Sequence, residues 1–143
     1  MAITTAVCTS YKAELATGTH NFTNSTGDVF KIALYTSAAT LGASTTAYSA
    51  TNEVSGTGYS AGGNTLTNTT PTTSGTTAYW GFGSSTAWNT ASFTARGALI
   101  YNSSKSNKAI AVWDFGADQT VSSGTFTINF PTTDSTNAIL RIA

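Results

Sequence analysis

Histidine, cysteine and carboxylate side chains carry most acid–base, nucleophilic and metal chemistry in proteins, and this sequence contains few of them. It has one histidine, His20, one cysteine, Cys8, and six acidic residues. Nucleophilic catalysis needs a nucleophile, a base within hydrogen-bond reach and a group that orients the base. His20 follows a predicted helix in a polar, glycine-containing connection and has no such partner nearby in the sequence. We therefore interpret it as a surface-loop residue without a catalytic role.

Metal and cofactor sites also lack their usual residues. A single cysteine excludes an intrachain disulfide and leaves a thiolate metal site without partners, so Cys8 is predicted to be a buried, inert thiol. The segment 114–118 is far from a calcium-binding loop. The glycine-containing segment 56–63 has neither the lysine nor the strand–helix context of a phosphate-binding loop, and its glycines suit turns. We expect no metal ion and no cofactor.

Glycoside hydrolysis needs only two carboxylates, so the acidic residues need separate attention. Glu14 is predicted on the exposed side of a helix. Three others occur among turn residues, where carboxylates commonly accept hydrogen bonds from backbone N–H groups: Asp28, Asp118 and Asp134.

Two carboxylates remain as candidate acids, Glu53 and Asp114. Asp114 shares a strand face with Ile110 and Val112, so an inward-facing carboxylate there needs a partner such as Arg96 or Arg141. A structural ion pair is the favoured interpretation. An enzyme using Glu53 or Asp114 remains the alternative, but no second catalytic group is placed, and we expect the protein not to be an enzyme.

Composition narrows the classes of partner. Charged residues make up only 8% of the chain, and six basic residues balance six acidic ones, so the basic patch expected of a nucleic-acid-binding protein is missing. Zero net charge favours association between copies. No apolar stretch approaches the roughly 20 residues that span a bilayer, and the first residues lack the features of a secretory signal. We expect neither nucleic acid nor membrane as a partner, and synthesis in the cytosol.

The pattern of apolar residues predicts a mainly β fold with one short N-terminal helix. The chain contains 30 threonines, which favour strands. Spacings of three and four predict a helix over 5–17, with Thr4 or Thr5 as N-cap and Gly18 as the stop. Alternation predicts strands at 29–35, 76–82, 92–101, 107–115, 124–130 and 137–142.

One or two weak strands are expected between residues 48 and 69. A hairpin is predicted at 102–107 and a looser connection at 116–119. These elements predict a single domain over residues 1–143, an antiparallel β-sandwich or jelly-roll-like fold of about seven or eight strands.

Aromatic residues mark a candidate interface in the half of the chain with low charge. Residues 36–75 are dominated by small polar side chains, and such long irregular segments are usually functional or held by a partner. Tyr and Trp are enriched at subunit interfaces and at sugar-binding faces. Core packing explains about half of the cluster, and the alternatives of oligomer contact and carbohydrate stacking stay open for these six: Tyr48, Tyr59, Tyr79, Trp80, Phe82 and Trp88.

Four segments together resemble a class of small virion structural proteins from tailed bacteriophages. They are residues 30–41, 48–66, 95–102 and 137–143, and the resemblance extends over nearly the whole chain. Its motifs carry no chemistry. The resemblance implies assembly into a virion, either as a capsid decoration (cement) protein or as part of the tail, and we favour the capsid surface.

As a cement protein the chain would bind the major capsid protein in many copies, often as a homo-oligomer for which a trimer is favoured, and would stabilise the head. The alternative is a tail-associated or host-adhesion module whose aromatic residues bind glycans.

Overall fold

Threonine-rich, alternating segments form eight antiparallel strands in a computed structural model that describes residues 2–143. The mainly β fold, the single short helix and the number of strands expected from the sequence are confirmed. In chain order the elements are β1 (Ala6–Val7), α1 (Thr9–Ala16), β2 (Phe30–Tyr35), β3 (Asn64–Thr65), β4 (Asn68–Ser74), β5 (Thr77–Phe82), β6 (Ser85–Asn102), β7 (Lys108–Asn129) and β8 (Leu140–Ile142).

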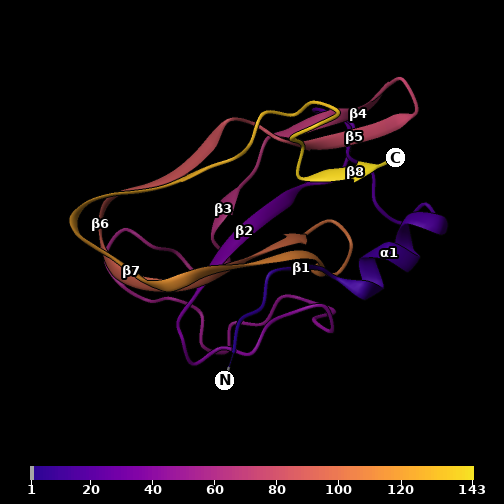
Figure 1. The fold of residues 1–143 in the computed structure, drawn as a ribbon. Coiled ribbons are helices and arrows are strands. Elements are labelled where there is room, and N and C mark those ends of the chain that lie inside the picture. The colour runs from indigo at the N-terminus through magenta and orange to yellow at the C-terminus, as the bar shows by residue number, and fades with distance from the viewer. Residues whose placement is uncertain (1) are drawn as a thin grey trace.

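The strands form two sheets. One has five strands in the order β1-β7-β6-β2-β3, and the other has three in the order β4-β5-β8. All strand pairs within them are antiparallel. In Figure 1 the three-stranded sheet lies above the five-stranded one, as in a β-sandwich, and α1 lies at one end of the molecule.

Strands β6 and β7 form one long hairpin that bends back over itself at the end of the molecule away from α1 (Figure 1). The predicted hairpin at 102–107 is confirmed. The prediction of two strands joined by a loop at 116–119 is wrong, because β7 is a single strand of 22 residues. Gly116 has a φ of +82°, and the pairing of β6 with β7 shifts register at four places. Such β-bulges bend a strand without ending it.

The helix is shorter than the predicted 5–17, and its predicted start is wrong. Ala6 and Val7 pair with β7 instead, and the N–H of Cys8 donates to Ile110 O at 2.9 Å. Because these backbone groups complete the sheet, the helix begins only at Thr9. Its end agrees with the prediction, since Gly18 has a φ of +65° and the backbone there returns hydrogen bonds to the last helical turn.

The core lies between the two sheets and continues on the other side of β2. Phe30 on β2 stacks on Phe22 at 4.2 Å and lies 5.8 Å from Phe82 of the second sheet, between ring centroids. Five of the six residues of β2 are buried, because the connection 36–63 covers its second face. The N–H of Val54 in that connection donates to Leu34 O at 2.9 Å. Within the described residues, no helix has the length and apolar character required to cross a bilayer.

Candidate functional site

The six aromatic residues predicted as an interface do not gather on one surface. Trp80, Phe82 and Trp88 are only 6%, 2% and 3% exposed. Trp80 and Phe82, two residues apart on β5, share one face of that strand, and Trp88 on β6 also points to the interior. Tyr48, Tyr59 and Tyr79 are half-buried.

The three buried rings belong to two separate parts of the core. Trp80 and Phe82 pack around Phe22, at centroid distances of 6.0 and 6.1 Å. Trp88 packs against Tyr59 and Phe93, at 6.0 and 6.5 Å. The expectation that Trp80, Phe82 and Trp88 meet a partner is therefore wrong for this fold.

Glu53, one of the two candidate acids, accepts three hydrogen bonds from its own connection. The donors are the hydroxyls of Tyr48 (2.7 Å) and Tyr59 (2.6 Å) and the N–H of Gly62 (2.7 Å). The Tyr59 hydroxyl oxygen also accepts the N–H of Leu34 on β2, at 2.9 Å. Burial and the hydrogen bond to Glu53 raise the pKa of Tyr48 and of Tyr59 well above the usual value. Both hydroxyls therefore remain donors near neutral pH, and the carboxylate holds the connection 36–63 against the sheet.

His20 lies inside the protein, which overturns the surface-loop prediction, and its side chain is 0% exposed. Its Nδ1 lies 2.9 Å from Asn102 Nδ2, and its Nε2 lies 2.6 Å from Glu14 Oε2. Asn102 Oδ1 accepts the N–H of Ser104 at 3.0 Å, which fixes the orientation of the amide. Asn102 Nδ2 therefore donates to Nδ1, and the imidazole carries its proton on Nε2 and donates to Glu14.

Glu14 is likewise not the exposed helix residue that was predicted. Its side chain is 16% exposed and lies 3.1 Å from Lys108 Nζ as well as against His20. Burial raises the pKa of Glu14, but hydrogen bonds from His20 and Lys108 outweigh burial and bring the pKa below its usual value. Through these contacts the cluster joins α1 to the β6–β7 hairpin, with the imidazole enclosed at its centre.

Cys8 is fully buried, as predicted. Burial and the nearby charge of Glu14 raise the pKa of its thiol to about 11, so the thiol is protonated and unreactive near neutral pH. Within residues 2–143, no three side chains of His, Cys, Asp or Glu gather in a way that would hold a metal ion.

Asp114, the second candidate acid, forms the ion pair that was predicted with Arg96, at 3.5 Å. The pair is at the surface and not inward-facing, since the two side chains are 32% and 35% exposed. Arg96 also contacts Asp118 at 3.2 Å. Asp118 lies on β7, so its predicted turn position is wrong.

The other two turn carboxylates are as predicted. Asp28 accepts the backbone N–H of Asn21 at 2.9 Å. Asp134 accepts those of Thr136 and Asn137 at 2.8 and 2.7 Å. Hydrogen bonds from Asn137 and Thr136 keep the pKa of Asp134 below its usual value.

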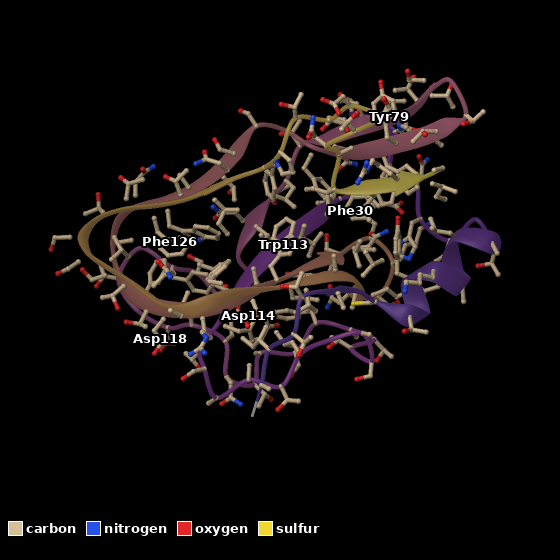
Figure 2. The ribbon with its side chains drawn as sticks, in the orientation of Figure 1. Phe30, Tyr79, Trp113, Asp114, Asp118 and Phe126 are labelled. Carbon is tan, nitrogen blue, oxygen red and sulfur yellow. The ribbon has the colours of Figure 1, made fainter. Side chains whose placement is uncertain are left out.

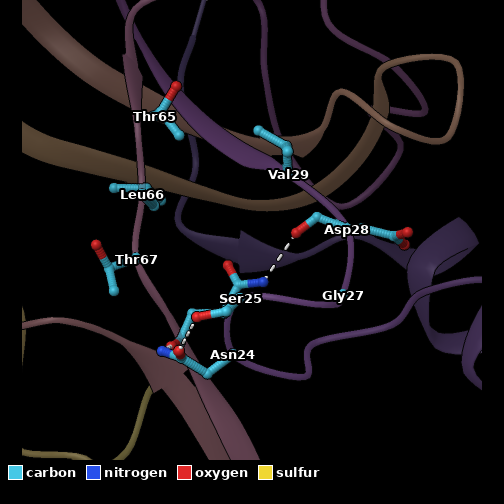
Figure 3. Close-up of a pocket in the computed structure, with 9 residues that line it drawn as sticks. Asn24, Ser25, Gly27, Asp28, Val29, Thr65, Leu66 and Thr67 are labelled. Carbon is cyan, nitrogen blue, oxygen red and sulfur yellow. Dashed lines mark hydrogen bonds between the residues drawn. The ribbon is translucent and has the colours of Figure 1, made fainter.

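A small cavity of about 230 Å³, with polar and apolar lining, lies between the 24–29 loop and residues 65–68 (Figure 3). Asn68, which lines it, donates from Nδ2 to Asp28 O at 2.9 Å, so its Oδ1 faces the other way and has no partner within the described residues. Val29 at the rim is 47% exposed. A buried acceptor without a protein partner is the usual setting of an ordered water.

A surface left uncovered by neighbouring strands follows the outer edge of β7. Within the described residues, β1 pairs with β7 only at Ala111 and Val112, and no other strand pairs with that edge from Trp113 to Asn129. The N–H of Asp114 donates to Thr5 Oγ1 and that of Gly116 donates to Asp114 Oδ1, both at 2.9 Å. A long strand edge that has no neighbouring strand is a template for pairing with another chain.

Half-buried apolar side chains line a groove beside this edge, between the two layers. Phe115 on the first part of β7 faces Phe126 on the returning part, with centroids 6.2 Å apart. Trp113 lies 5.8 Å from Phe130. Figure 2 shows Trp113 and Phe126 in the space between the layers.

We define the open face as the β7 edge from Trp113 to Asn129 together with this groove. A hollow beside α1 neighbours the groove, and Ile139 lines both. That hollow also contains Ile142, which is 54% exposed. The apolar residues of the open face are Trp113, Phe115, Phe126, Ile128, Ile139 and Ile142.

One sequence pattern indicates this surface, although the predicted aromatic interface does not include it. From Ala109 to Phe115 nearly every residue is apolar, although an outer strand with one solvated face alternates. An apolar run of this kind indicates a strand with both faces covered. The chain covers Ile110 and Val112 completely but leaves Trp113 and Phe115 half-buried.

No protein-family model, curated protein or solved structure matches this chain.

Proposed function

We propose that this protein is a structural subunit of a tailed-bacteriophage virion, a cement protein that decorates the capsid by non-covalent contacts and stabilises the head. The observation that carries the assembly role is the open face, where a long unpaired strand edge borders a groove of half-buried aromatic and aliphatic side chains. Such a surface is costly to leave in water and gains stability when another protein covers it. Its low charge removes electrostatic opposition to assembly.

A non-catalytic role is consistent with the polar clusters. Glu53 is engaged by three donors of its own chain, and His20 is enclosed. Placement on the capsid rests on the resemblance of four sequence segments to phage virion proteins. The glycan-binding alternative is weaker than the sequence suggested, because Trp88, proposed as part of its stacking surface, is 3% exposed.

Copy number in purified virions tests the proposal. Hundreds of copies per particle, removable without breaking the head but with loss of its heat resistance, support the cement role. A few copies, matching the symmetry of the tail, would move the protein to the tail. Absence from the particle would overturn the virion role altogether.

A further inference from the structure

We propose that a second copy of this chain covers the open face, with the two copies related by a two-fold axis and their β7 edges running antiparallel. The inference rests on the proposed function, because it names the partner of the same surface. It departs from the trimer that the resemblance implies.

The centre of the open face is suited to pairing with itself. A two-fold interface requires a self-complementary surface, and an apolar patch meets this condition because apolar contact is non-directional. With the axis near Phe115, the groove around Trp113 and Ile128 would pack on its own copy. The adjoining β7 edges, both unpaired, would exchange backbone hydrogen bonds and extend each sheet into the other.

The two ends of the open face carry opposite charge. Asp118 lies towards one end, and it shares a single arginine, Arg96, with Asp114 nearer the centre, so these three side chains carry one net negative charge. At the other end, Lys12 and Arg141 line the hollow beside α1, and neither forms an ion pair within residues 2–143.

These ends are well separated along the molecule. Figure 2 places Asp118 at the end of the view opposite to the helix that carries Lys12. Ala111 on β7 pairs with Val7, just before α1. Asp118 lies seven residues further along β7, which is about 23 Å at the rise of a strand. An antiparallel copy would therefore bring the acidic end of each chain to the basic end of the other. This complementarity selects a second copy as the occupant.

The apolar part of the proposal is tested by a matched pair of variants. Ile142 and Val29 are the exposed large aliphatic residues of the described chain, at 54% and 47%. Ile142 is on the open face, whereas Val29 lines the cavity between the 24–29 loop and residues 65–68. We expect the wild-type protein to sediment with twice the mass of one chain. Ile142→Asp should weaken association at least about tenfold, since it buries a charge in the interface, and Val29→Asp should leave it unchanged.

The charged part is tested by mixing two variants that each repel themselves. Asp118→Lys makes both ends of the face positive, and the double variant Lys12→Glu with Arg141→Glu makes both ends negative. Each should associate at least about tenfold more weakly than the wild type, whereas an equimolar mixture should form the heterodimer. The difference should shrink at high salt. Lys105→Glu, which reverses one charge away from the open face, is the control for a charge reversal outside the interface and should leave association unchanged.

Four results would overturn the inference: a monomeric wild type at millimolar concentration, a mass of three or more chains, equal effects of Ile142→Asp and Val29→Asp, or a mixture that behaves as its two components. A monomer that still binds virions would leave the proposed function intact and assign the open face to another virion protein. A dimer that is absent from virions would support the second-copy inference and overturn the proposed function.

Discussion

The two halves of the β6–β7 hairpin differ in how much of the molecule covers them. In the covered half, residues 97–102 and 108–112, the strands lie between β1 and β2, and nearly every side chain is buried. In the open half, beyond Trp113 on β7, every position is half-buried or exposed and the outer edge has no neighbouring strand. The same pair of strands therefore supplies stability at one end and surface at the other. The segments packed around each half of the hairpin determine whether that half contributes stability or surface.

The largest contrast should come from adding a methyl group to one glycine beside each half. A Cβ at Gly63, next to β2, would collide with the carbonyl oxygen of Ile32, whereas a Cβ at Gly116 has nothing within 4 Å. Both residues have positive φ, so both substitutions carry a backbone cost of about 1–2 kcal/mol. We expect Gly63→Ala to lower the free energy of unfolding by about 4 kcal/mol or more, and Gly116→Ala by only the backbone cost. Urea unfolding measures both, and equal midpoints would contradict the contrast.

Removing the same side chain from each half should give the next largest difference. Ile110 is 0% exposed in the covered half, and Ile128 is half-buried in the open half. We expect Ile110→Ala to cost about 3 kcal/mol and Ile128→Ala about 1 kcal/mol, because only the first leaves a closed cavity. Unfolding should be followed at low protein concentration, where association does not contribute. A larger loss at Ile128 would show that the open half carries the stability.

Substitutions of polar groups should also destabilise the covered half more than the open half, but by smaller amounts. Glu53→Gln weakens a carboxylate that accepts three hydrogen bonds against the covered half, and we expect a loss of about 2 kcal/mol. Asp118→Asn removes an exposed ion pair with Arg96 on the open half, and we expect less than about 0.5 kcal/mol. Thermal unfolding of the two variants compares them directly. Similar shifts in Tm would remove the distinction.

The smallest predicted effect is on the stability of the protein at acidic pH. Hydrogen bonds from His20 and Lys108 outweigh burial and hold the folded-state pKa of Glu14 below its usual 4.5. Between the two pKa values the unfolded chain binds more protons, so the stability that Glu14 contributes is present above about pH 4.5 and is lost as the pH falls through the lower, folded pKa. We expect Glu14→Gln to flatten this part of the curve of stability against pH. Parallel curves for variant and wild type would contradict the shift.

The elements predicted from the sequence are those determined by neighbouring residues. The strand at 29–35 and the hairpin at 102–107 follow from alternation and turn residues, and both are present. The start of the helix was missed because its first predicted residues complete a sheet with β7, more than a hundred residues away. No local pattern reports such a contact.

The candidate site was predicted less well, for the same reason. His20 is buried by Asn102, 82 residues further along the chain, so its polar local sequence misplaced it. Trp80, Phe82 and Trp88 were recognised as a cluster, but only the pairing of strands shows that they face inward. An ion pair of Asp114 was predicted because a carboxylate within a strand needs a partner, and of the two candidates, Arg96 and Arg141, the fold brings Arg96 to it.

The short loop between β6 and β7 has a consequence for how the chain folds. Five residues, 103–107, join the two longest strands, so their pairing begins with local contacts and can extend outward from the turn within microseconds. The pairing of β1 with β7 and of β5 with β8 must instead close loops of about a hundred and about sixty residues, which costs more chain entropy. The hairpin should therefore be the folding nucleus, and mutations near its turn should slow folding, whereas those in β8 should mainly speed unfolding.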